Sequence, residues 1–210
     1  NKFAEPIKKI KIIDRNFSNV IDFDNSRRNS NLGYIVKNTR VLNIFKSYLK
    51  KRKNINILDN SNIIGLEYNN DKVITYGSDF KVYSDLNVAA DGKNSFIKKL
   101  LKTNSYKKKY LKKALVLTFS HSANHNNTAY EFFYKNGPLA ILPMQKTKNE
   151  YNSSIVWTNN NEYIDSLSNM DIPSLISTIN ESTRNIIGSV KKIHTLQIFP
   201  LSAHLNTKFY

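Results

Sequence analysis

The sequence predicts a mixed fold, in which a first part of alternating strands and helices (α/β) precedes a second part built on an antiparallel sheet (α+β). Two observations lead to this prediction. Strand-like and helix-like segments alternate up to about residue 105, and four strand-like segments then follow at regular spacing. With 210 residues, of which 40% are hydrophobic and 11% aromatic, the chain can bury a core of normal size. We therefore expect two domains, residues 1–105 and 106–210.

The first part is predicted from its apolar spacing and its turns. Apolar residues recur from Ile7 to Phe23 as in a strand, and the polar stretch Asp24–Asn31 reads as a loop. Thr39 can cap a helix that continues to about Lys53, because apolar residues recur there at helical spacing. Three short strand signals separated by polar turns indicate a β-meander, namely Asn62–Tyr68, Lys72–Tyr76 and Phe80–Ser84.

The second part is predicted to be a sheet whose strands are joined by Asn-, Gly- and Lys-rich turns. Its strand signals are Ala114–Phe119, Thr128–Tyr134, Leu139–Met144 and Ser153–Thr158. This spacing favours antiparallel pairing over further βαβ units. Asp171 is expected to cap a helix over residues 173–187, with Pro173 in its first turn and Gly188 after its end. A last strand is predicted from Val190 to Phe199.

The formal net charge of +16 allows two interpretations. Basic proteins often bind nucleic acid or anionic membranes, so a basic RNA- or membrane-surface-binding module stays open. However, only six of the 32 basic residues are arginine, whereas nucleic-acid contacts favour arginine. The accompanying excess of Lys, Asn and Ile is typical of an AT-rich genome, and we favour this compositional explanation. No nucleic-acid motif is recognisable, so no nucleic-acid partner is expected.

Other features of the composition exclude several classes of site. The chain has no cysteine, which excludes disulfides and thiolate metal sites. Its apolar runs are too short to span a bilayer. His121 and His125 are four residues apart but lie in a predicted loop, so no metal site is predicted. The absence of an initiator Met suggests a fragment or a processed chain.

Two segments carry possible binding chemistry. In the first, a compact apolar strand, Leu86–Ala90, ends at Asp91-Gly92 and leads into a short helix, Ser95–Leu101. Small residues allow a ligand to approach the backbone, and a helix start offers N–H groups to phosphate, although Asp-Gly after a strand is more often only a turn. The second segment, Leu32–Arg40, runs from a glycine into the predicted helix and by itself reads as an ordinary loop and N-cap.

In this order, and together with a third segment, these motifs resemble those of the p-hydroxybenzoate-hydroxylase-like flavoprotein monooxygenases, in particular the ubiquinone-biosynthesis branch. The family segments GYxVEN and V(G/A)ADGxxSxxR are matched by Gly33–Asn38 and Val88–Lys98. The pattern TAYERF…GPLALLP…SxVW is the most specific to this branch. It is matched by Thr128–Phe133, Gly137–Pro143 and Ser154–Trp157, and the closing Phe199-Pro200-Leu201 also fits. The resemblance covers nearly the whole chain.

The resemblance implies an FAD-dependent monooxygenase that uses O₂ to hydroxylate the aromatic ring of a polyprenylated phenol. It implies NAD(P)H or an electron-transfer protein as the reductant, and other ubiquinone-biosynthesis proteins as possible partners. A cytoplasmic location, with peripheral contact at the inner membrane, would suit such a protein. The flavin would carry the chemistry while the protein positions the ring and excludes water, so no catalytic side chain is assigned. A soluble aromatic substrate is the alternative within the same superfamily.

The resemblance also implies two groups of site residues. The FAD-binding group comprises Tyr34, Val36, Asn38, Asp91 and Gly92. The group expected to wall the substrate cavity comprises Tyr130, Phe132, Pro138, Leu142 and Trp157. Plain core packing is an equally good interpretation of this second group, because aromatic residues on a half-buried strand usually lie in the core.

The sequence departs from the family pattern at several positions. Lys37 stands where Glu is usual, Lys98 where Arg is usual, and Lys112 where Gln is frequent. The glycine-rich FAD fingerprint that precedes these motifs in the family, and the Gly-Asp motif that follows them, are both missing. We therefore expect a fragment that binds FAD poorly on its own.

Overall fold

The computed structural model describes residues 3–14, 20–25, 30–69, 71–147 and 149–207. The chain forms two compact units, of which unit 1 contains residues 1–45 and 110–201 and unit 2 contains residues 46–109 and 202–210. Each unit is thus assembled from two separate stretches of sequence. The division into functional domains at residue 105 stays a prediction.

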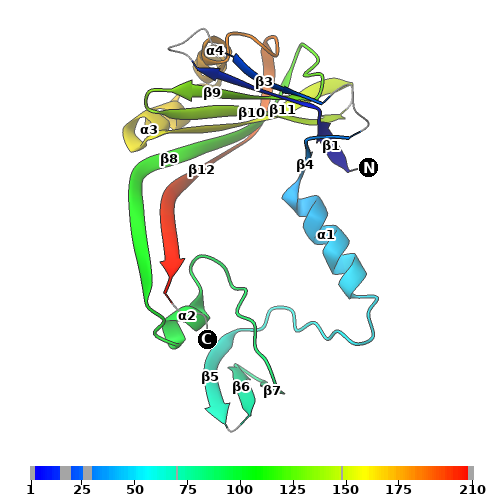
Figure 1. Ribbon diagram of the computed structural model, residues 1–210, viewed down its shortest axis with the longest axis vertical. Helices are drawn as coiled ribbons and strands as arrows, with labels where there is room; N and C mark the ends of the chain where they lie inside the picture. Colours follow the sequence, from blue (N-terminus) through cyan, green and yellow to red (C-terminus); the bar gives the residue numbers. More distant parts are fainter. Residues whose placement is uncertain (1–2, 15–19, 26–29, 70, 148, 208–210) are drawn as a thin grey trace. The chain divides into compact units, whose positions relative to one another are not determined.

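Unit 1 is built on a seven-stranded sheet with the strand order β12-β8-β11-β10-β9-β2-β3 (Figure 1). Strands β8, β11, β10 and β9 pair antiparallel, which confirms the predicted antiparallel sheet. Strand β2 adds to this sheet parallel to β9 and forms an antiparallel pair with β3, an arrangement that the sequence did not predict. The strands are β2 (Lys9–Asp14), β3 (Val20–Asp24), β8 (Ser105–His121), β9 (Thr128–Tyr134), β10 (Gly137–Thr147), β11 (Glu150–Asn160) and β12 (Val190–Asn206).

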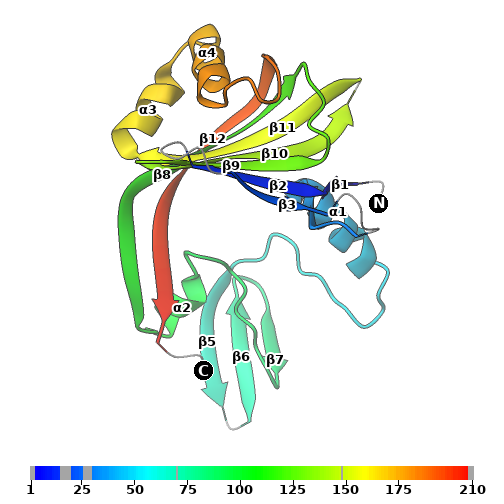
Figure 2. The same ribbon diagram turned by 45° about the horizontal axis from the view of Figure 1, so that its top comes forward.

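The two faces of this sheet differ. Helices α3 (Asn161–Asn169) and α4 (Ile172–Ser182) lie over one face (Figure 2), and the main hydrophobic core lies beneath them. Because side chains alternate along a strand, the residues between the core positions belong to the opposite face. We call this opposite face the second face. On β9 and β10 it includes Glu131, Phe133, Pro138, Ala140 and Leu142.

The helices of unit 1 begin at polar caps. Asn160 accepts a hydrogen bond from the Tyr163 N–H at 2.9 Å, and Asp171 accepts one from the Ser174 N–H at the same distance. The helix capped by Asp171 was predicted, but it ends at Ser182 rather than near residue 187. Its chain direction changes there because Arg184 and Asn185 adopt positive φ. Helix α3 was not predicted. Only two of its residues are buried, so few apolar positions mark it in the sequence, and it begins directly after strand β11.

A short two-stranded sheet, β1 (Ala4–Ile7) with β4 (Gly33–Val36), precedes the first helix. Helix α1 (Asn38–Leu49) confirms the predicted helix, although it ends four residues before Lys53. No residue of α1 is buried in the described structure. Its apolar stripe is thus exposed.

Unit 2 contains the predicted β-meander and the short helix. Strands β5 (Ile63–Asn69), β6 (Lys72–Gly77) and β7 (Lys81–Ser84) pair antiparallel in sequence order. Helix α2 (Phe96–Leu100) follows, with Ser95 as its N-cap. The predicted strand Leu86–Ala90 is wrong, because this segment pairs with no strand in the described residues and its side chains are exposed, Leu86 to 76% and Val88 to 75%. A continuous apolar run of this kind is typical of a strand buried on both faces, and the described residues supply no such sheet.

Candidate functional site

Unit 2 holds a pocket of about 790 Å³ beside the Asp91-Gly92 turn. The meander supplies one side through Leu66, Glu67 and Tyr68, and the segment from Asp85 to Lys98 supplies much of the rest. The last part of β12 contributes His204 and Asn206. The turn predicted from sequence to adjoin a ligand therefore does lie at a concavity.

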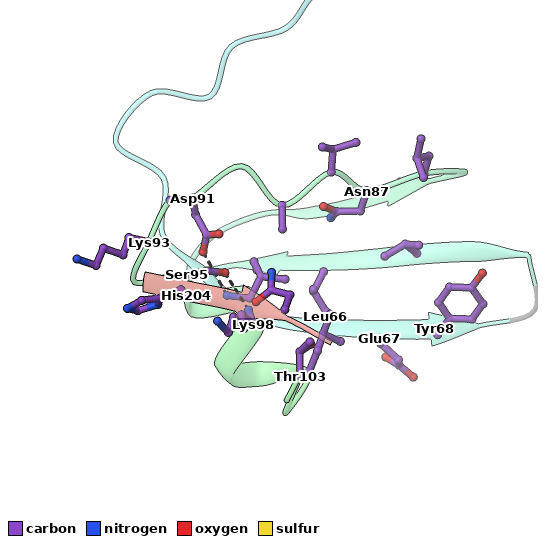
Figure 3. A pocket seen from close by; sticks show the side chains of 18 of the residues that line it. Leu66, Glu67, Tyr68, Asn87, Asp91, Lys93, Ser95, Lys98, Thr103 and His204 are labelled. Carbon is purple, nitrogen blue, oxygen red and sulfur yellow. Dashed lines mark hydrogen bonds between the residues drawn. The ribbon is translucent and has the colours of Figure 1, made fainter. Parts of the chain in front are cut away.

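Asp91 shapes this pocket by holding the start of α2. Its Oδ2 atom accepts hydrogen bonds from the backbone N–H groups of Phe96, at 2.7 Å, and Ile97, at 3.2 Å (Figure 3). Hydrogen bonding by Ser95, and then by these two backbone groups, lowers the pKa of Asp91 below its ordinary value. The Lys98 N–H is taken by the Ser95 Oγ at 2.9 Å. The helix start thus offers fewer free N–H groups to a phosphate than the sequence suggested, and Asp91 acts by ordering the loop.

Two lysines and a histidine lie at the same end of the pocket. Lys93, Lys98 and His204 all line it and lie around Asp91 in Figure 3. Desolvation, followed by the charges of Lys93, Lys107 and Lys98, lowers the pKa of His204. Repulsion between neighbouring cations would be relieved by an anion. Lys93 and Lys98 thus favour an anion at this end, whereas Glu67, Asp85 and Asp91 add three carboxylates to the lining of the pocket.

Gly92 adds a conformational requirement. Its φ is +81°, a left-handed conformation that side-chain-bearing residues rarely adopt, and a Cβ built there would meet nothing within 4 Å. The glycine is thus required for the turn and leaves the backbone open to a ligand.

The other proposed cofactor residues lie in unit 1. Tyr34 and Val36 are on the exposed side of β4, and Asn38 is the first residue of α1. The Tyr34 hydroxyl accepts a hydrogen bond from the Asn31 side chain at 2.8 Å. Their side chains are accessible, and their role at a flavin stays a prediction.

The five residues predicted to wall the substrate cavity lie on both faces of the unit 1 sheet. Tyr130, Phe132 and Trp157 face α3 and α4, where Phe132 and Trp157 are buried in the core and Tyr130 packs against it. Pro138 and Leu142 belong to the second face. The five residues thus divide between the two faces, and of these five Pro138 and Leu142 lie on the second face; their role at a substrate stays a prediction.

His121 and His125, which were predicted to lie together in a loop, form a buried pair in unit 1, and His121 is the last residue of β8. The His121 Nδ1 lies 3.1 Å from the Ile187 carbonyl oxygen and its Nε2 lies 3.0 Å from the Ser153 Oγ. The His125 Nε2 lies 3.1 Å from the Met144 carbonyl oxygen. Burial, and then the neighbouring His125, lowers the pKa of His121. These hydrogen bonds are structural, and the described residues contain no group of three potential metal ligands.

Comparison with known proteins shows similarity to ubiquinone-biosynthesis enzymes. The ubiquinone biosynthesis monooxygenase COQ6 of Xenopus tropicalis is 28% identical over 189 residues, covering 85% of this chain and 40% of that protein. Ubiquinone hydroxylase UbiL of Rhodospirillum rubrum is 27% identical over 165 residues, covering 78% of this chain and 38% of that protein. The chain is a relative of the ubiquinone-biosynthesis hydroxylases. It spans about 40% of the length of these relatives, and no family model matches it.

Solved structures share the fold. The structure of PqsL, a probable FAD-dependent monooxygenase from Pseudomonas aeruginosa, has a TM-score of 0.72 at 14% identity and covers 95% of this chain and 56% of its own. The flavin-dependent halogenase CmlS has a TM-score of 0.68 at 11% identity, covering 96% of this chain and 38% of its own. The chain therefore shares the fold of part of each of these two proteins. This confirms the predicted fold class.

Two residues of interest were missed in the sequence. His204 has no partner within its own segment, and it reaches the pocket only because β12 returns next to the beginning of β8. Glu131 lies within the quoted motif Thr128–Phe133, where the aromatic residues drew attention instead. A carboxylate in an otherwise apolar and aromatic strand was the signal that could have identified it.

Proposed function

We propose that the whole protein is an FAD-dependent monooxygenase that hydroxylates the aromatic ring of a polyprenylated phenol in ubiquinone biosynthesis. The observation that carries this proposal is the sequence similarity to ubiquinone hydroxylases along most of the chain, with the Asp91-Gly92 motif lying at a pocket that Lys93 and Lys98 also line. The reductant is proposed to be NAD(P)H or an electron-transfer protein.

The unit 2 pocket is the proposed location for the anionic part of FAD. Lys93 and Lys98 would neutralise phosphate charge, His204 would lie beside them, and Gly92 would allow the backbone to approach the phosphate. Asp91 would keep this loop in place without touching the phosphates, since like charges repel. Tyr34, Val36 and Asn38 are proposed to lie near the flavin in the whole protein. When bound, FAD would supply the redox chemistry that transfers oxygen from O₂ to the ring.

The second face of the unit 1 sheet is the proposed substrate wall. Pro138 and Leu142 offer apolar side chains there, as the prenylated ring requires. Tyr130, Phe132 and Trp157 would act from behind by fixing the sheet through the core. Water exclusion at this wall would protect the activated oxygen from side reactions.

Contact with a membrane and with other ubiquinone-biosynthesis proteins is proposed for the whole protein, since a polyprenylated substrate is carried in membranes. Within the described residues, no helix has the length and apolar character that crossing a bilayer needs. Exposed apolar residues of α1, including Leu42, Phe45 and Tyr48, are available for such contacts.

The proposal is tested on the whole protein, purified and incubated with a reductant, O₂ and a short-chain prenylated phenol. Flavin absorbance after gel filtration and a product with one added oxygen atom are the expected results. Lys93→Ala with Lys98→Ala should lower flavin content severalfold, while Lys135→Ala, at an exposed turn outside the pocket, should not. Hydroxylation of simple phenols with no use of prenylated ones would favour the soluble-substrate alternative. Absence of flavin together with salt-sensitive RNA binding would replace the proposal with the basic-module alternative.

A further inference from the structure

Glu131 is a carboxyl group in unusual surroundings on the second face. The strand register places it opposite Ala140 on β10 and Ile12 on β2. The segment of β10 from Gly137 to Met144 contains no charged residue. The nearest charged residue on β2 that shares the face is Asp14. It pairs with Phe133, the next residue of β9 on the same face after Glu131. Glu131 therefore lies among apolar residues with no cation beside it.

Within the described part of the chain, Glu131 makes no hydrogen bond and no ion pair. Half-buried carboxylates are normally satisfied by donors, because an unpaired buried charge is costly. Burial alone raises the pKa of Glu131 above its ordinary value. The group thus retains a vacant acceptor among apolar neighbours.

The neighbours of Glu131 suit a flat aromatic ligand. Ala140 is small and leaves room above the carboxyl group, and Phe133 exposes 47% of its surface on the same face. Pro138 and Leu142 extend the apolar surface along β10. A ring that packs on this surface would bring a substituent oxygen towards Glu131. The one polar feature of such a ring that fits a carboxylate is an O–H donor.

We infer that Glu131 binds the phenolic hydroxyl of the aromatic substrate by accepting its hydrogen bond. The inference rests on the proposed function, because it assumes that the ligand of this face is a phenol. The negative charge near the hydroxyl would also increase electron density in the ring, which favours attack by electrophilic oxygen. Glu131 thereby distinguishes a phenol from a ring that lacks the donor, and hydrogen bonds to charged groups give such discrimination about tenfold or more.

The test compares a short-chain prenylated phenol with its O-methyl ether, which retains the ring and tail but cannot donate. Binding of both compounds is measured by perturbation of flavin absorbance in the whole FAD-loaded protein. The unmodified protein should prefer the phenol by about tenfold or more. Glu131→Gln should reduce this preference to a few fold, because an amide oxygen accepts more weakly, and Glu131→Leu should abolish it. Flavin content, measured by absorbance after gel filtration, reports whether each variant is folded.

A matched control is Glu150→Gln, which alters another partly buried glutamate at the far end of β11 and should leave the preference intact. A folded Glu131→Leu variant that retains the full preference would overturn the inference. If the Leu variant does not fold, an unchanged preference in Glu131→Gln would overturn it equally. Product formation by the unmodified protein separates the two proposals. With hydroxylation present, a retained preference refutes only the role of Glu131, whereas a flavin-containing protein that hydroxylates no phenol refutes the proposed function and the inference together.

Discussion

Trp157 offers a test of whether an aromatic residue of the family motif serves the core or the substrate. Its side chain is 3% exposed. Its ring packs edge-on against that of Tyr163, with 5.6 Å between the ring centroids. It lies in register between Leu115 and Leu139. The indole Nε1–H is buried and has no hydrogen-bond partner among the described residues. The apolar contacts of Trp157 therefore favour a role in the core. The unsatisfied indole N–H destabilises this arrangement.

Two substitutions of Trp157 should differ in their effect on the free energy of unfolding. Trp157→Ala should lower the free energy of unfolding by about 3–5 kcal/mol, the usual cost of emptying a large aromatic site. Trp157→Phe should cost much less, about 1 kcal/mol. The smaller ring loses packing, but its substitution also removes an unsatisfied buried donor that costs roughly 1–3 kcal/mol.

Urea unfolding of the whole protein, combined with hydrogen exchange of peptides from β8, β10 and β11, measures both effects. In Trp157→Phe, exchange protection and the KM for a prenylated phenol should remain close to those of the unmodified protein. A Phe variant that is as unstable as the Ala variant would show that the indole N–H has a partner. A normal stability with a strongly raised KM would refute the core assignment and return Trp157 to the substrate wall.

Three further predictions concern the loop, a turn and a carboxyl group. In the whole protein, Asp91→Ala should lower the flavin content after gel filtration more than Asp91→Asn does. The reason is that an amide oxygen still accepts hydrogen bonds from the N–H groups of α2. Normal flavin content in both variants would contradict the ordering role of Asp91. Gly137→Ala should cost at least about 2 kcal/mol in urea unfolding, because φ is +148° and the added Cβ would meet the Thr158 carbonyl oxygen at 2.2 Å. Gly65→Ala, whose Cβ has ordinary space at 3.6 Å or more, should stay within about 0.5 kcal/mol. Burial raises the pKa of Glu131, so the folded state binds its proton more tightly, and the unfolding free energy should fall as pH rises from the ordinary carboxyl pKa through the raised one. In Glu131→Gln the unfolding free energy should fall less over this pH range. The difference between the two proteins should be below about 1 kcal/mol, because the group is only partly buried. The same pH dependence of unfolding in the variant and in the unmodified protein would contradict the burial of Glu131.

Local signals in the sequence were sufficient for the meander, for α1 and for the antiparallel sheet. The meander has polar turns between short alternating runs, and the helix that starts near Thr39 has apolar residues at helical spacing. Both signals depend on neighbours within a few residues. The capping residue Asp171 was also identifiable for this reason, whereas the predicted cap Thr39 is wrong, because α1 begins at Asn38.

Signals that depend on distant parts of the chain were not accessible. The parallel addition of β2 to β9 joins segments more than one hundred residues apart, and nothing in Lys9–Asp14 specifies that partner. The same limit explains Leu86–Ala90, whose composition suits a buried strand although no described strand pairs with it. Residue type alone predicts burial for such a run, whereas the pairing partner decides whether a strand forms.

The candidate site shows the same division. The Asp91-Gly92 turn was identified from its local pattern and lies at a pocket, but the contribution of His204 required the return of β12. The residues of the aromatic motif all lie on the unit 1 sheet, but the sequence did not indicate which face each side chain takes. Only the strand register separates Pro138 and Leu142, on the second face, from Phe132 in the core.

The most direct test of the proposed function follows the origin of the oxygen atom in the product. The whole protein is supplied with reductant, a short-chain prenylated phenol and isotope-labelled O₂, and the hydroxylated product is analysed by mass spectrometry. We expect one labelled oxygen atom in the ring of the product, and formation of this product should require bound FAD. Product whose oxygen comes from water, or a flavin-loaded protein that forms no hydroxylated phenol, would contradict the assignment of this chain to an aromatic-ring monooxygenase.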